Sequence, residues 1–95
     1  NICIFADGEL DRSPTGTGVS ARAAVERARG RLKEDEKIYI ESITGAIFSV
    51  SIKETLSLGD FEAIIPRVGG DASITGKSTF WIDPSDPLKD GFLLK

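Results

Sequence analysis

The sequence predicts an α+β fold, in which a curved and mostly antiparallel sheet wraps around one central helix. An alanine-rich segment near the start of the chain carries apolar residues three and four positions apart, which is typical of a helix. After it, apolar and polar residues alternate in about four segments separated by turn residues, which favours antiparallel strands. With 95 residues, the chain has the size of one small domain, residues 1–95.

The first predicted element is a buried strand over residues 2–6, because this run is short, β-branched and aromatic and is closed by Asp7-Gly8. Cys3, the only cysteine, lies between two isoleucines, so we expect a packed thiol rather than a nucleophile. A single cysteine forms no internal disulfide and fits a reducing, cytoplasmic location. The chain has no methionine and opens on an apolar run, so we expect a piece of a longer protein.

A helix is predicted from Pro14 to about Arg29. Ser13 is a favourable N-cap, proline suits the first helical position, and Gly30 is a typical C-terminal stop. We expect an apolar stripe against the sheet, made of Ala21, Ala24, Val25, Ala28 and Leu32. The solvated face is expected to carry Arg22, Glu26, Arg29 and Lys33.

Four strands are predicted after the helix, over residues 38–42, 47–52, 61–65 and 73–82. In the first of them, Ile38 and Ile40 face one way and Tyr39 the other. Gly76 indicates a bulge in the last. Tyr39 and Trp81 are expected in or near the core, and the apolar residues 92–94 are expected to dock on another part of the protein.

The composition narrows the classes of function. The net charge of −3 gives no support for a nucleic-acid or membrane-surface partner, and no apolar run is long enough to span a membrane. The chain has no histidine, so it offers neither a Ser–His pair nor a His-bound metal.

The start of the predicted helix is a candidate anion site. Backbone amides of the first turn have no helical partner, and at Gly16 a ligand can approach the backbone closely. Hydroxyls of Thr15 and Thr17 flank the spot. The alternative is that Gly16 and Gly18 only allow close packing and that the threonines only cap. Asp11 either solvates the loop or meets a cation on the same ligand, and a carboxylate together with an ammonium describes an amino acid.

Two segments resemble the proline racemase family. ADGELDRSPTGTGVSARAA, residues 6–24, resembles its second active-site segment, which usually reads aspartate-arginine-serine-proline-cysteine-glycine-threonine-glycine. ITGKSTFWIDPSDPLKDGFLLK, residues 74–95, resembles its C-terminus. The resemblance implies a two-lobed, diaminopimelate-epimerase-like fold with the active site between the lobes, and this chain resembles the C-terminal lobe alone.

The resemblance also implies an activity. Racemases of the family place one cysteine at each of two helix starts, whereas this chain has Thr15 in the second place. An alcohol is a far weaker acid or base than a thiol with a pKa of about 8.5, so two-base racemisation should fail. Threonine marks the family's trans-3-hydroxy-L-proline dehydratases. In these, the N-terminal lobe's cysteine removes the Cα proton, the β-hydroxyl leaves as water, and Δ1-pyrroline-2-carboxylate forms without a cofactor.

The resemblance assigns roles to four further residues. Gly16 and Thr17 would hold the substrate carboxylate, Asp11 the ring nitrogen, and Phe5 would form an apolar wall. Two alternatives stay open: a proline or hydroxyproline racemase or epimerase, and a non-catalytic amino-acid-binding module. We expect residues 1–95 alone to be inactive without the N-terminal lobe, and an exposed apolar surface would favour a homodimer.

Overall fold

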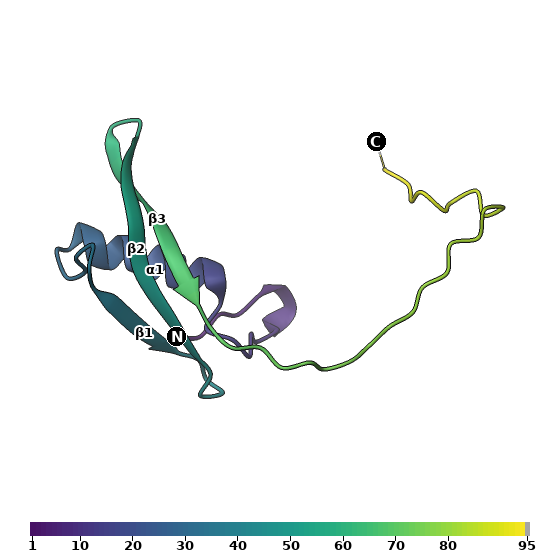
Figure 1. Ribbon diagram of the computed structural model, residues 1–95, viewed down its shortest axis with the longest axis horizontal. Helices are drawn as coiled ribbons and strands as arrows, with labels where there is room; N and C mark the ends of the chain where they lie inside the picture. Colours follow the sequence, from purple (N-terminus) through teal and green to yellow (C-terminus); the bar gives the residue numbers. More distant parts are fainter. Residues whose placement is uncertain (95) are drawn as a thin grey trace.

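The computed structural model describes residues 1–94 as one helix packed on a small sheet. A short 3-10 turn, η1 (Ala6–Gly8), precedes the helix α1 (Gly16–Ala28). Three strands follow, β1 (Lys37–Glu41), β2 (Ile47–Leu58) and β3 (Phe61–Gly69), and they form one antiparallel sheet in the order β1-β2-β3. Helix α1 crosses one face of this sheet (Figure 1). The predicted α+β class is confirmed. Within residues 1–94, no helix combines the length and apolar character needed to cross a membrane.

The three strands follow the predicted patterns and turns. Ile38 and Ile40 of β1 are half-buried, whereas Tyr39 between them is exposed, as an alternating strand requires. Gly59 takes a positive φ of 60° in the tight turn between β2 and β3, where the sequence predicts a turn. Both strands are longer than predicted because the hairpin pairing continues past a bulge near Ile52.

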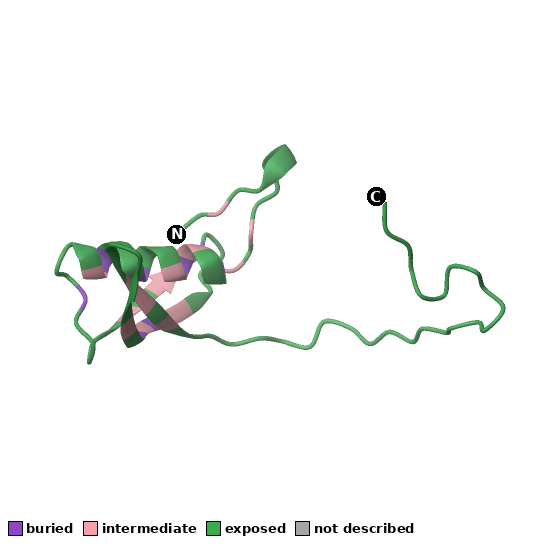
Figure 2. Cartoon of the chain, turned by 90° about the horizontal axis from the view of Figure 1, so that it is seen from above, coloured by how far each residue is buried: buried purple, intermediate pink, exposed green. Residues whose placement is uncertain are grey.

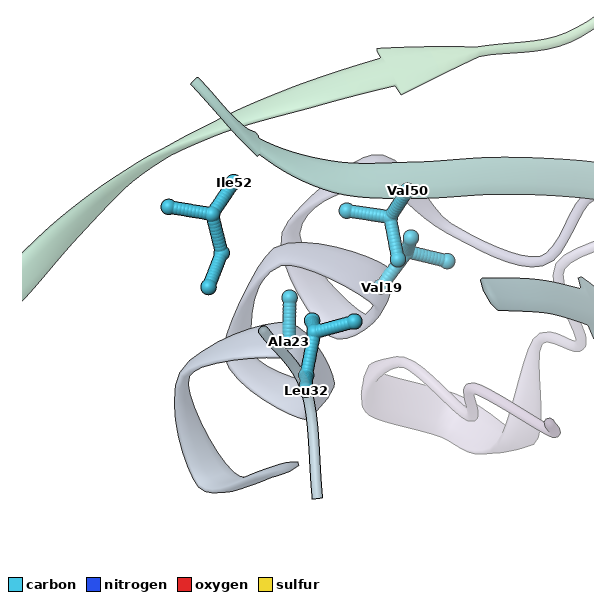
Figure 3. Packing of buried hydrophobic residues seen from close by; sticks show 5 residues of the cluster. All are labelled: Val19, Ala23, Leu32, Val50 and Ile52. Atoms are coloured by element: carbon cyan, nitrogen blue, oxygen red, sulfur yellow. The ribbon is translucent and has the colours of Figure 1, made fainter. Parts of the chain in front are cut away.

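A small hydrophobic core lies between α1 and the sheet, and Figure 3 shows its five fully buried members. They are Val19 and Ala23 of α1, Leu32 after the helix, and Val50 and Ile52 of β2. The predicted stripe is therefore wrong except at Leu32, because Ala21, Ala24, Val25 and Ala28 are exposed on the opposite side of α1. The alanines do form an apolar face, but the described sheet covers the other one.

Glu26 lies on the face of α1 that the sheet covers. We expected Glu26 on the solvated side, yet it is 8% exposed beside the core. Its carboxylate lies 2.8 Å from Arg22 Nε and 2.6 Å from Arg31 Nε. Burial raises the pKa of Glu26, but the hydrogen bonds and charges of Arg31 and Arg22 outweigh it, so the net pKa lies below its ordinary value. An acid paired in this way is tolerated in a buried face, and spacing alone does not reveal the pairing.

Two predicted strands are wrong. Residues 2–6 form no strand: Ile4 makes one isolated bridge to Leu10, on the other side of η1, and Cys3 is half-buried rather than packed in a core strand. Residues 73–82 are extended but unpaired, so Gly76 marks no bulge. A strand needs a continuous hydrogen-bonded neighbour. Residues 2–6 pair only briefly with residues 9–11, and residues 73–82 have no neighbouring strand among residues 1–94.

After β3 the chain runs away from the sheet as an extended segment and then curls back through turns from residue 83 onward (Figures 1 and 2). Trp81 is 92% exposed and Tyr39 70% exposed, so the prediction that both lie in or near the core is wrong. The apolar residues 92–94 are exposed as well, and the structure shows no docking site for them within residues 1–94. The radius of gyration is 18.9 Å because of this segment, whereas a compact domain of this length has about 12 Å.

Candidate functional site

The helix start is built from the loop between η1 and α1. Helix α1 begins at Gly16 with Thr15 as its N-cap, so the prediction of Ser13 as N-cap and Pro14 as the first helical residue is wrong. Ser13 instead stabilises the loop before the helix: its Oγ accepts a hydrogen bond of 3.0 Å from the backbone N–H of Thr15. Local bonds of this kind compete with helix formation and delay the start of the helix.

Both carboxylate oxygens of Asp11 accept hydrogen bonds from this loop. Its Oδ1 accepts the backbone N–H of Ser13 at 2.8 Å, and its Oδ2 accepts the hydroxyl of Thr15 at 2.8 Å. These bonds, first that from the Ser13 backbone and then that from the Thr15 hydroxyl, hold the pKa of Asp11 below its ordinary value. Asp11 is therefore a carboxylate at neutral pH and presents a negative charge beside the helix start.

Thr15 has an unusual backbone. Its φ of 68° and ψ of 112° lie in a region that β-branched residues rarely adopt. The side chain is 7% exposed, and its hydroxyl is committed as a donor to Asp11. The oxygen of Thr15 therefore has lone pairs left to accept a hydrogen bond, because its one proton is already donated.

The first amides of α1 remain open to a ligand. Gly16 and Thr17 are exposed, and a methyl group placed on Gly16 would meet nothing within 4 Å. By position, the N–H groups of Gly16, Thr17 and Gly18 have no acceptor inside the helix. The helix dipole adds partial positive charge at the same place. An anion such as a carboxylate fits this end of α1.

The structure brings four of the five candidate residues into one continuous segment, Asp11, Thr15, Gly16 and Thr17. Phe5 lies apart from them. It precedes η1 in a loop that stands off from the helix and sheet in Figure 2, and it is 53% exposed. Its backbone N–H donates to the Glu9 carbonyl, which closes this small loop on itself. Within residues 1–94, Phe5 makes no wall against Thr15.

Sequence reasoning missed two residues that support the site. Ser42 and Thr44, in the turn after β1, each donate a side-chain hydrogen bond to the carbonyl of Arg12, at 2.8 Å and 2.6 Å. Ser42 is 6% exposed although it is polar. The available signal was its place two residues after Ile40, on the inward face of β1. The pattern shows that Ser42 points inward but not which group it meets.

A cavity of about 500 Å³ lies elsewhere, between α1 and β1. Its lining does not include Asp11 or Thr15, and consists of Asn1, Arg22, Glu26, Arg31, Ile38, Tyr39, Ile40 and Glu41. Within the described residues, no three acidic or cysteine side chains gather as a metal-binding group. The helix start thus offers a carboxylate, a hydroxyl acceptor and open amides. Together these groups can hold an amino acid by its ammonium and its carboxylate.

The chain is similar to known proteins along almost its whole length. The family model described as proline racemase matches residues 1–93. The chain is 54% identical over 95 residues to a trans-3-hydroxy-L-proline dehydratase of Colwellia psychrerythraea and 50% identical over 95 residues to a proline racemase of Clostridioides difficile. Both matches cover 100% of this chain, but only 27% and 28% of the relatives' lengths.

A solved structure of known function has a similar fold. A hydroxyproline epimerase from Agrobacterium vitis, with bound trans-4-hydroxy-L-proline, superposes with a TM-score of 0.77 at 35% identity. The superposition covers 98% of this chain and 27% of that structure. A match along nearly the whole sequence, with the same backbone, identifies this chain as a member of the proline racemase family.

Proposed function

We propose that this chain is the C-terminal lobe of a cofactor-independent trans-3-hydroxy-L-proline dehydratase. The observation that carries the proposal is Thr15, a threonine at the helix start where racemases of the family are expected to have their second cysteine. The relatives of similar identity include both dehydratases and racemases, so overall similarity does not choose between the two activities. We base the choice on the chemistry of residue 15.

The substrate would lie with its carboxylate against the start of α1. The amides of Gly16 and Thr17 would donate to this carboxylate, and the helix dipole would favour its charge. Asp11 would accept a hydrogen bond from the protonated ring nitrogen while remaining ionised, as its lowered pKa permits. Donors at the carboxylate also stabilise the charge that develops when the Cα proton leaves.

The elimination balances without a second base. The base takes the Cα proton, and the electron pair of the C–H bond forms the Cα–Cβ double bond. The Cβ–O bond breaks, and the leaving oxygen becomes water by taking up the proton that the base removed, because the Cα hydrogen and the 3-hydroxyl of the trans isomer lie on the same face of the ring. The resulting enamine then shifts a proton from nitrogen to carbon and gives Δ1-pyrroline-2-carboxylate. In this proposal the base is the cysteine of the N-terminal lobe, which is the partner that completes the site.

Thr15 would face the side of the ring opposite the base, where a racemase needs its second acid. Its hydroxyl proton is donated to Asp11, so its oxygen can only accept a hydrogen bond on that side, for example from a water. The racemase and epimerase alternative requires an acid at this position that protonates Cα. A threonine alcohol is far too weak an acid for that step.

The proposal is tested on the full-length protein with trans-3-hydroxy-L-proline. We expect Δ1-pyrroline-2-carboxylate, which borohydride reduces to proline and chromatography then detects. L-Proline and trans-4-hydroxy-L-proline, incubated in parallel, should keep their configuration. Inversion at Cα of either, without dehydration of the 3-hydroxy substrate, would overturn the proposal in favour of the racemase or epimerase alternative. Binding without any turnover would favour the non-catalytic module.

The isolated polypeptide of residues 1–95 should be inactive in the same assay. Asp11 is a weak base because its pKa is lowered and both of its oxygens already accept hydrogen bonds. The hydroxyl of Thr15 is no base at neutral pH. Dehydration by this polypeptide alone would show that the proton acceptor lies within it.

A further inference from the structure

The carbonyl of Arg12 is the point where the sheet holds the site loop. Ser42 Oγ donates to this carbonyl at 2.8 Å and Thr44 Oγ1 at 2.6 Å, and the two hydroxyls lie 2.8 Å apart. The backbone N–H of Thr44 also donates to Ser42 Oγ at 3.2 Å. A second tie lies nearby, where Asn1 Nδ2 donates to the Pro14 carbonyl at 2.8 Å. Residues outside the loop thus hold it in place, namely Ser42 and Thr44, which lie 30 and 32 residues from Arg12, and Asn1, 13 residues from Pro14.

We propose that Ser42 and Thr44 are positioning residues of the active site. They act through Arg12, whose neighbours Asp11 and Ser13 both bond to Thr15. This inference rests on the proposed function for its kinetic consequences, but its structural part stands on the hydrogen bonds alone.

The backbone of Thr15 gives the reason for such support. A β-branched residue with a φ of 68° is strained, and strained conformations persist only where the surroundings fix them. The Asp11 and Ser13 bonds to Thr15 are local, so they fix it only while the loop itself stays in place. Two donors on one carbonyl supply that constraint, and buried Ser42 is shielded from competing water. The turn after β1 therefore sets where the Thr15 hydroxyl and the first amides of α1 point.

The test removes both donors in the full-length protein. The double variant Ser42→Ala/Thr44→Val should lose about tenfold or more in kcat/KM for trans-3-hydroxy-L-proline, since small displacements of positioned groups are costly. Hydrogen exchange of the peptide covering residues 11–20 should become faster, because the amides of Ser13 and Thr15 lose their fixed acceptors. Ser42→Thr/Thr44→Ser, which keeps both hydroxyls, should restore most of both properties.

A matched core variant separates positioning from general stability. Ile52→Val removes one methylene from the buried face of β2, away from Arg12, and should lower Tm without changing kcat/KM or the exchange of residues 11–20. Unchanged exchange and unchanged kcat/KM in the Ser42/Thr44 double variant would overturn the inference. If the wild-type protein dehydrates nothing, the proposed function fails, yet the exchange measurement still decides whether Ser42 and Thr44 hold the loop.

Discussion

The hydroxyl of Thr15 donates a 2.8 Å hydrogen bond to Oδ2 of Asp11, four residues earlier in the chain. The same carboxylate accepts the Ser13 amide through its other oxygen. Asp11 therefore has two tasks in our proposal, because it orients the Thr15 hydroxyl and supplies charge for the substrate's ring nitrogen. Both tasks need a full carboxylate.

Asp11→Asn tests these two tasks, because it keeps the size of the side chain and removes its charge. An amide has one acceptor oxygen and no charge, so it keeps at most one of the two loop bonds and attracts a cation poorly. We expect kcat/KM for trans-3-hydroxy-L-proline to fall about tenfold to a hundredfold, as is typical for hydrogen bonds to charged groups. Steady-state kinetics of the full-length protein measures this. Asp35→Asn, at an exposed turn carboxylate, is the control and should behave as wild type. Equal activity of the two variants would remove Asp11 from the site.

Thr15→Cys should introduce exchange at Cα. A thiol at the helix start has a pKa far nearer to neutral than an alcohol, so it can return a proton to the face opposite the first base. In deuterated water, substrate recovered after partial turnover should carry deuterium at Cα above the wild-type level, as mass spectrometry would detect. Thr15→Ser keeps an alcohol and should show no increase. A folded Cys variant without any additional exchange would mean that residue 15 does not face Cα.

The local elements of this fold could be predicted from the sequence, because each depends on neighbours within a few residues. The alternation around Ile38 and Ile40 predicted β1, and Gly59 marked the turn between the next two predicted strands. Gly30 also ends the helix region as predicted, with a φ of 70° and its N–H on the Arg27 carbonyl.

The remaining features depend on partners that are distant in sequence. Glu26 is buried because Arg31, beyond the helix end, neutralises it. Residues 73–82 have the pattern of a strand, but pairing needs a neighbour that the described residues do not supply. In the site, the order of residues around Gly16 and Thr17 indicated an anion-binding helix start. The shift of that start to Gly16 came from side-chain bonds of Asp11 and Ser13, which spacing does not reveal.

Acid should destabilise the protein partly through Asp11. Its folded pKa lies below the unfolded value of 3.8, so the folded state binds fewer protons. The stability it contributes is complete above the unfolded pKa and is lost as the pH falls through the folded pKa. Urea unfolding between about pH 6 and 3 should therefore show a falling free energy of unfolding below about pH 4.

Asp11→Asn should flatten this acid limb only in part. Glu26 also has a lowered pKa and contributes a loss of the same sign in acid. Asp71→Asn, at an exposed carboxylate, is the matched control and should leave the wild-type profile in place. An acid limb that is equally steep in wild type and Asp11→Asn would contradict the role of the Ser13 and Thr15 hydrogen bonds.

Leu32 tests the small core that positions the helix. It is 1% exposed and packs with Val19, Ala23 and Val50, so Leu32→Ala leaves a cavity between α1 and the sheet. We expect a loss of about 2–5 kcal/mol in the free energy of unfolding, measured by urea denaturation of the full-length protein. Leu32→Met conserves the volume and should cost less than about 1.5 kcal/mol. Because Val19 lies one turn from Thr15, the Ala variant should also raise KM. A similar cost for both variants would contradict the view that lost packing volume at Leu32 determines the stability of this face.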